Sequence, residues 1–110
     1  MSLTLYGGPK TRASMPRWYL EEKGIPYELK ELDLRGSQHR QPDYLAINPF
    51  GKLPALVDTS QQGMDGQPLK LFESGAILLH LAEHHAGEIT SASQRSLIAQ
   101  WLLFANATLA

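Results

Sequence analysis

The sequence predicts an α/β fold, in which a βαβ unit is followed by a β-hairpin and a further helix around a four-stranded mixed sheet. Apolar and polar residues alternate at residues 3–6 and, roughly, at residues 27–32, which is typical of short strands. A helical pattern lies between these two segments. Two more apolar runs, at residues 55–57 and 69–72, stand on either side of an Asp-Gly turn pair and indicate an antiparallel hairpin.

The first predicted helix runs to about residue 23 and ends before Gly24, a residue type common just past helix C-termini. Pro16 fits only in a first helical turn. Either Ser14 is therefore the N-cap, or the turn at Thr11 and Arg12 is irregular. We expect four side chains to share the face that packs on the core: Met15, Trp18, Tyr19 and Glu22.

The rest of the chain gives three more elements. Residues 43–47 predict a short helix, and residues 59–68 form a long turn between the two hairpin strands. Ser74 is the expected N-cap of a helix that continues to about His85.

We expect one domain at residues 1–85, a linker at residues 86–92 and a separate helix at residues 93–110. A capping box, Ser91 with Gln94, precedes this last helix. Its apolar positions recur at helical spacing: Leu97, Ile98, Trp101, Leu102, Phe104, Ala105 and Thr108.

Composition excludes several classes of function. A formal net charge of -1 gives no general reason to bind nucleic acid or an anionic membrane, and no apolar run is long enough to span a bilayer. With no signal peptide visible, we expect a cytoplasmic protein. The chain has no cysteine, which excludes disulfides, thiolate metal sites, a cysteine nucleophile and a dithiol couple. Any thiol chemistry must use a thiol that the ligand brings.

Three of the four histidines lie close together in the sequence. His80 and His84 have the i, i+4 spacing of a helical metal site, and His85 follows them. No carboxylate or other third ligand converges on them in sequence. We therefore expect a solvated helix end and no metal.

Three motifs occur in order: Lys-Gly-Ile-Pro-Tyr-Glu at residues 23–28, Asn-Pro-Phe-Gly-Lys-Leu-Pro at 48–54 and Glu-Ser-Gly-Ala-Ile at 73–77. Together they resemble the N-terminal, thioredoxin-like domain of the cytosolic glutathione S-transferases. That resemblance covers about residues 1–85. Residues 93–110 resemble only the first helix of the all-helical domain that follows in the family. We therefore expect this chain to be a fragment of a longer protein.

The resemblance implies a site for glutathione. Glu73 suits the ammonium of its γ-glutamyl unit, and Ser74 with the helix N-terminus suits the carboxylate of that unit. The backbone of Leu53, held by a Pro54 that is cis in the family, would pair with the cysteinyl unit. Three groups are candidates for the glycine carboxylate: His39, Arg40 and Lys52.

Family members lower the pKa of the glutathione thiol with a residue near the end of the first strand or the start of the first helix. The candidates here are Tyr6, Thr11, Arg12 and Ser14. A guanidinium beside a helix N-terminus stabilises a thiolate by its positive potential. Residues 7–14 also resemble the cyanobacterial-type (chi class) members, which are thought to use an arginine. Arg12 is our first choice and Tyr6 the second.

The expected function is that of a homodimeric glutathione S-transferase, which conjugates the thiolate of glutathione, its co-substrate, to electrophilic small molecules in detoxification. The alternative is a glutathione-binding or protein-interaction module of the same fold with little catalysis. A disulfide reductase of the glutaredoxin kind is disfavoured by the absence of cysteine.

Overall fold

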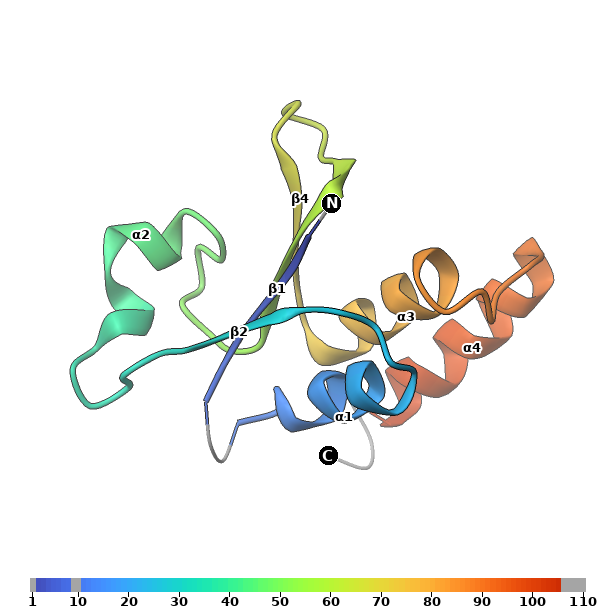
Figure 1. The fold of residues 1–110 in the computed structure, drawn as a ribbon, viewed down its shortest axis with the longest axis horizontal. Coiled ribbons are helices and arrows are strands. Elements are labelled where there is room, and N and C mark those ends of the chain that lie inside the picture. Colours follow the sequence, from blue (N-terminus) through green and yellow to red (C-terminus); the bar gives the residue numbers. More distant parts are fainter. Residues whose placement is uncertain (1, 9–10, 106–110) are drawn as a thin grey trace.

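A four-stranded mixed sheet forms the centre of the molecule (Figure 1). The computed structural model describes residues 2–8 and 11–105. Strand β1 pairs in parallel with β2, whereas β3 is antiparallel to both β1 and β4. The sheet has the order β2-β1-β3-β4 and consists of β1 (Leu3–Gly7), β2 (Glu28–Glu31), β3 (Ala55–Gln62) and β4 (Pro68–Phe72). The predicted thioredoxin-like α/β architecture is thereby confirmed.

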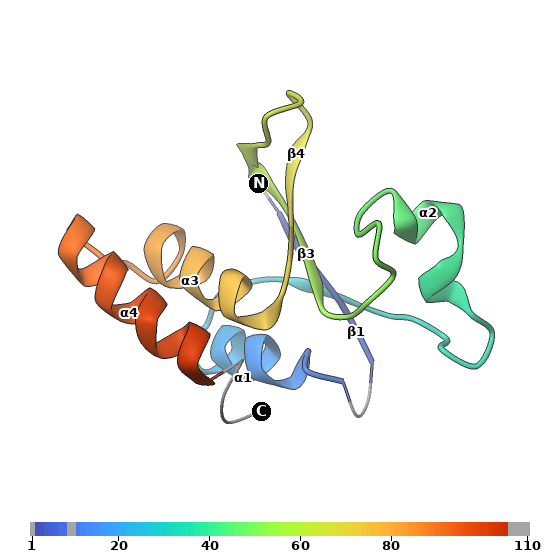
Figure 2. The same cartoon turned by 180° about the vertical axis from the view of Figure 1, so that it is seen from behind.

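Helices cover the two faces of this sheet unequally. In Figures 1 and 2, α1 and α3 lie on one side with α4 beyond them, and the small α2 lies on the other. The bounds are α1 (Ser14–Glu22), the 3₁₀ helix η1 (Gln38–Arg40), α2 (Pro42–Leu45), α3 (Ser74–His84) and α4 (Ala92–Phe104). The main core fills the space between the sheet, α1 and α3: Leu3, Leu5, Leu20, Ile25, Leu56, Ile77 and Leu81.

The predicted core face of α1 was wrong. Met15 and Trp18 are 57% and 62% exposed, and Glu22 is exposed as well. The buried stripe is instead Pro16 and Leu20, which lie four residues apart on the opposite side of the helix. Tyr19 alone of the predicted four packs against the core.

Close packing at the start of α1 explains this orientation. A Cβ on Gly7 would come within 2.4 Å of the Ala13 Cβ, so only glycine lets the chain before α1 approach β1 so closely. Ser14 is the first helical residue and not the N-cap. The alternative of an irregular first turn is the one observed. The Thr11 hydroxyl accepts a hydrogen bond from the Ala13 N–H at 3.2 Å and donates one to the Gly8 carbonyl at 2.7 Å.

The hairpin differs from prediction mainly in length, and the short helix α2 is likewise shorter than the predicted segment at residues 43–47. Strand β3 continues through the predicted turn to Gln62, which pairs with Pro68 after an irregularity in register. The turn shortens to residues 63–67, and Gly66 in its Asp-Gly pair has φ +79°. This end of the hairpin extends away from the helices (Figure 1), so its polar side chains remain in solvent.

The last helix is capped as predicted. The Ser91 hydroxyl accepts a hydrogen bond from the Gln94 N–H at 3.2 Å, although the Gln94 side chain reaches back to Thr90. Helix α4 lies against α3 (Figure 2), with Ile98 and Leu102 half-buried, and leaves four large apolar side chains exposed: Leu97, Trp101, Leu103 and Phe104. The predicted Thr108 lies outside the described residues. Within the described ranges, no helix is long and apolar enough to cross a membrane.

Candidate functional site

An open cleft of about 1260 Å³ lies where the segment before α1, the 48–54 turn and the start of α3 meet. Eight of the nine predicted site residues line it: Arg12, His39, Arg40, Lys52, Leu53, Pro54, Glu73 and Ser74. Six lining residues that we did not single out as ligand contacts are Leu34, Leu45, Asn48, Phe50, Gly51 and Phe72. The volume is ample for a tripeptide.

The four candidates for thiol activation are separated by this geometry. Arg12 and Thr11 line the cleft, whereas Ser14 lines a separate, smaller depression formed mainly by α1 and β2. Tyr6 lines neither of these two cavities; its ring lies 5.6 Å from the Tyr44 ring, centroid to centroid. Position in the fold therefore favours Arg12 and Thr11 over the other two.

Two buried donors fix the carbonyl that precedes Leu53. The Tyr44 hydroxyl donates to the Lys52 carbonyl oxygen at 2.6 Å, and the Asn48 side-chain amide donates to the same oxygen at 2.9 Å. Burial raises the pKa of Tyr44 to about 12, so its hydroxyl remains a donor. The peptide bond between Leu53 and Pro54 is cis, as the family resemblance implied. The backbone at Leu53 is thus held from both sides.

Neither Tyr44 nor Asn48 was predicted to support the site. Asn48 belongs to the Asn-Pro turn signal, and that signal could have identified it as a residue whose side chain bonds its own turn. For Tyr44 the sequence carries no comparable signal, because its hydroxyl bonds the carbonyl of a residue eight positions later in the chain.

We expect Asn48→Ala to lower the free energy of unfolding by roughly 1–3 kcal/mol. Asn48 is 1% exposed, and its side chain also accepts a hydrogen bond from the Phe50 N–H at 3.0 Å. Removal of the Asn48 amide leaves the buried Lys52 carbonyl with one hydrogen-bond donor fewer. Urea denaturation measures the change, with the exposed Gln62→Ala as the control. Equal stability of Asn48→Ala and the unmodified chain would contradict this account of the turn.

The position of His39 depends on close packing between the 48–54 turn and η1. A Cβ on Gly51 would come within 2.9 Å of the His39 carbonyl oxygen, and Gly51 has φ +68°. Glycine therefore lets the 48–54 turn pack directly on η1. Among the described buried side-chain atoms, His39 Nδ1 is one without a hydrogen-bond partner. An imidazole with an unpaired nitrogen at the cleft suits a polar ligand.

The start of α3 forms the opposite wall of the cleft. Ser74 is the first helical residue and is buried, so the prediction that it is the N-cap was wrong. Glu73 takes that position with φ +77°, a conformation that is costly for any residue except glycine. Its side chain makes no capping hydrogen bond to the helix. The helix dipole and the first N–H groups of α3 favour an anion here.

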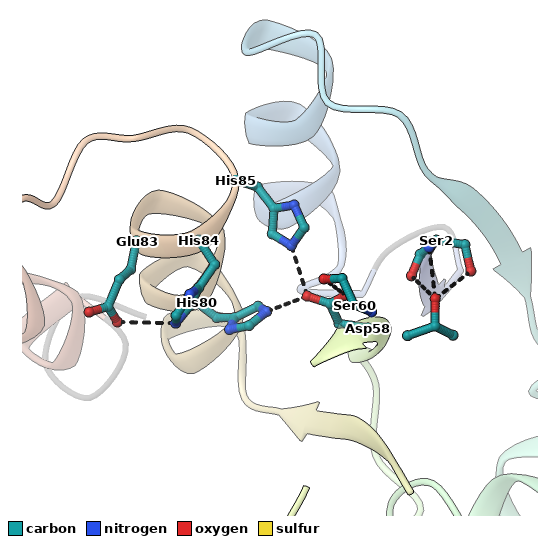
Figure 3. Close-up of polar contacts among 8 residues, drawn as sticks. Ser2, Asp58, Ser60, His80, Glu83, His84 and His85 are labelled. Carbon is teal, nitrogen blue, oxygen red and sulfur yellow. Dashed lines mark hydrogen bonds and ion pairs between the residues drawn. The ribbon is translucent and has the colours of Figure 1, made fainter. Parts of the chain in front are cut away.

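The expectation of a solvated histidine cluster was wrong for two of the three residues. His80 Nε2 lies 2.7 Å and His85 Nε2 lies 2.8 Å from the same Asp58 oxygen, Oδ2 (Figure 3). His84 alone is exposed as expected. The carboxylate comes from β3, 22 residues before His80, so spacing along the helix could not reveal it.

Comparison with known proteins settles the family. Residues 1–83 match the model of the glutathione S-transferase N-terminal domain. The chain belongs to the glutathione S-transferase family. The matched segment covers the whole sheet, η1 and all but the last residue of α3, and therefore every residue named in the cleft.

Three relatives of this chain illustrate the range of the family. The disulfide-bond oxidoreductase YfcG of Escherichia coli (strain K12) is 40% identical over 93% of the chain and 47% of its own length. A glutathione transferase of Burkholderia graminis, solved with two glutathione molecules per subunit, is 38% identical with a TM-score of 0.79 over 94% of this chain and 42% of that one.

A glutathione transferase of Pseudomonas putida, solved with one glutathione disulfide per subunit, is 37% identical. Its TM-score is 0.76 over 94% of this chain and 44% of its own. The chain thus spans about half the length of these members, and it resembles solved family structures that hold glutathione or glutathione disulfide.

Proposed function

We propose that the chain supplies the glutathione site of a glutathione S-transferase that conjugates the tripeptide to electrophilic small molecules. The observation that carries this proposal is that a single cleft gathers Arg12, the fixed backbone at Leu53 and the start of α3. The protein would act in the cytoplasm, in detoxification, as a homodimer.

The two ends of the cleft match the two ends of glutathione. Glu73 binds the γ-glutamyl ammonium, while Ser74 and the N-terminal N–H groups of α3 bind the adjacent carboxylate. Opposite them, three groups offer positive charge or hydrogen bonds to the glycine carboxylate: His39, Arg40 and Lys52. The backbone N–H and carbonyl of Leu53 pair with the cysteinyl unit between these ends.

Arg12 is the proposed activating residue, in keeping with the resemblance to chi class members. Its guanidinium lies in the segment just before α1 and lines the cleft. Positive potential from the guanidinium and the helix N-terminus favours the thiolate over the thiol, whose proton leaves to solvent. The thiolate sulfur then forms a bond to the electrophilic carbon, and the leaving group departs with its electron pair.

Disulfide reduction is the second candidate, and the relatives favour it over simple binding. One is named a disulfide-bond oxidoreductase, and the two solved transferases hold two glutathione molecules or a glutathione disulfide. The absence of cysteine does not prevent this chemistry if glutathione supplies both thiols. The first thiolate attacks a disulfide and releases one thiolate, and a second glutathione thiolate then displaces the other, leaving oxidised glutathione.

Helix α4 belongs, in this proposal, to a following all-helical domain, with residues 86–92 as the linker. Its exposed stripe carries Leu97, Trp101 and Phe104. That stripe needs apolar cover, which the sister helices of the family's second domain or a second protomer would provide. The electrophile pocket would be completed there.

The ionisation of bound glutathione tests the proposal. We expect the thiol of the complex, followed by the ultraviolet absorbance of the thiolate, to titrate well below the pH at which free glutathione titrates. Turnover by the full-length protein of an activated aryl halide, compared with turnover of a small disulfide, then separates conjugation from reduction. Binding with an unshifted thiol and no turnover would leave the non-catalytic module as the function.

A further inference from the structure

A buried polar cluster lies outside the glutathione cleft, where β3 passes the C-terminal end of α3 (Figure 3). It consists of Asp58, His80 and His85, none of which lines the cleft. The Asp58 side chain is fully buried, and those of His80 and His85 are only 7% and 8% exposed. Such burial of three titratable groups is unusual.

The chain path brings the two imidazoles to one oxygen atom. On a continuous helix, residues five apart point about 140° away from each other. Helix α3 ends at His84, however, and His85 leaves the helical conformation with φ −126°. Both rings therefore present Nε2 to Asp58 Oδ2. The other carboxylate oxygen, Oδ1, accepts hydrogen bonds from the Ser60 hydroxyl at 2.6 Å and the Ser60 N–H at 2.9 Å.

The contacts within the cluster set the ionisation of its carboxylate. Burial alone would raise the pKa of Asp58, but hydrogen bonds from Ser60, His85 and His80 outweigh it and hold that pKa well below its usual range. Burial lowers the pKa of His80. The remaining group facing them is His84, whose ring centroid lies 4.8 Å from that of His80 and which pairs with Glu83.

We propose that Asp58, His80 and His85 bind a divalent transition metal ion, with zinc the best match to two imidazoles and a carboxylate. Their ligand atoms all lie within 4.8 Å of one another. Four-coordinate zinc, with bonds of about 2.0–2.1 Å, separates its ligand atoms by about 3.3 Å. The two Nε2–Oδ2 distances of 2.7 and 2.8 Å must therefore open by about half an ångström, which small side-chain rotations achieve.

In the metal-bound form each neutral imidazole carries its proton on Nδ1, so that Nε2, which now faces Asp58, is free to bind the ion. Ser60 fixes the orientation of the carboxylate from outside the coordination sphere, as groups behind metal ligands commonly do. The site ties the end of α3 to β3, so the bound ion stabilises the fold without taking part in glutathione chemistry. Water completes the fourth position.

Untagged protein, freed of metal with a chelator and then dialysed, provides the test. We expect Co²⁺ alone to give the visible absorption of a tetrahedral site, Zn²⁺ to abolish that absorption, and Zn²⁺ to raise the midpoint of thermal unfolding. His80→Gln and His85→Gln should each weaken metal binding about tenfold or more. His84→Gln, which changes a neighbouring exposed histidine, should leave it intact.

Glutathione affinity serves as the independent readout, because the cluster lies apart from the cleft. His85→Gln should retain glutathione binding while it loses the metal. If His80→Gln does not fold, His85→Gln at the helix end decides the matter. The proposal is overturned if the unmodified chain shows neither the cobalt absorption nor a zinc-dependent rise in the unfolding midpoint, or if His84→Gln impairs binding as much as His85→Gln.

Discussion

Replacing Arg12 with alanine is expected to lower turnover about 10- to 100-fold while weakening glutathione binding much less. Arg12 lines the cleft from the segment just before α1. A charge-assisted hydrogen bond contributes roughly 1.5–3 kcal/mol, and each 1.36 kcal/mol corresponds to a factor of ten in rate. The guanidinium favours the thiolate and has little preference for the neutral thiol. Loss of the guanidinium therefore lowers kcat and raises the pKa of the bound thiol. Both quantities are measurable in the full-length protein.

Three variants serve as controls for Arg12→Ala. Arg17→Ala removes a cation from α1 that, like Ser14, lines the smaller depression and not the cleft. Tyr6→Phe and Ser14→Ala remove the competing hydroxyls. All three should leave turnover within about twofold of the unmodified enzyme. A large loss in Tyr6→Phe together with an active Arg12→Ala would transfer the activating role to Tyr6.

Local signals predicted most of the elements, and the family motifs pointed to residues that the structure gathers along one cleft. Strand alternation, Gly24 and the Asp-Gly pair each act within a few residues, so their consequences can be read from neighbouring positions. The same holds for the turn before β3, where the ring of Pro54 restricts the backbone and Gly51 permits the positive φ that the turn needs. The resemblance of the three motifs to the family predicted that the turn before β3 and the start of α3 would lie at one site.

Features that depend on distant contacts could not be predicted in the same way. The direction in which α1 turns depends on the contact between Gly7 and Ala13, which places Met15 outside although it lies on an apolar stripe. The histidine cluster depends on Asp58, which comes from β3, and on the end of α3 at His84, after which His85 leaves the helical conformation. Helical spacing gives the wrong exposure in both cases, burying Met15 and exposing the histidines, because it carries no information about neighbouring elements.

Glu73 is expected to show opposite effects on stability and on ligand affinity. Its φ of +77° costs about 1–3 kcal/mol for a side chain other than glycine. Glu73→Gly relieves that strain, at a cost of roughly 0.5–1 kcal/mol in backbone entropy. The free energy of unfolding should therefore stay the same or rise. Glutathione affinity should fall about 10- to 100-fold, because the charge-assisted contact to the γ-glutamyl ammonium is lost.

Ser37→Gly provides the matched control, since Ser37 is another described non-glycine residue at positive φ, +58°, and it does not line the cleft. It should gain comparable stability and keep its affinity for glutathione. Ser74→Ala should lose affinity by roughly 1–3 kcal/mol through the γ-glutamyl carboxylate, with urea denaturation to correct for any change in the helix start. Calorimetric titration with glutathione measures all three variants. If Glu73→Gly and Ser74→Ala both bind as tightly as the unmodified chain, glutathione does not occupy the start of α3; if only Glu73→Gly does, the ammonium is held elsewhere in the cleft.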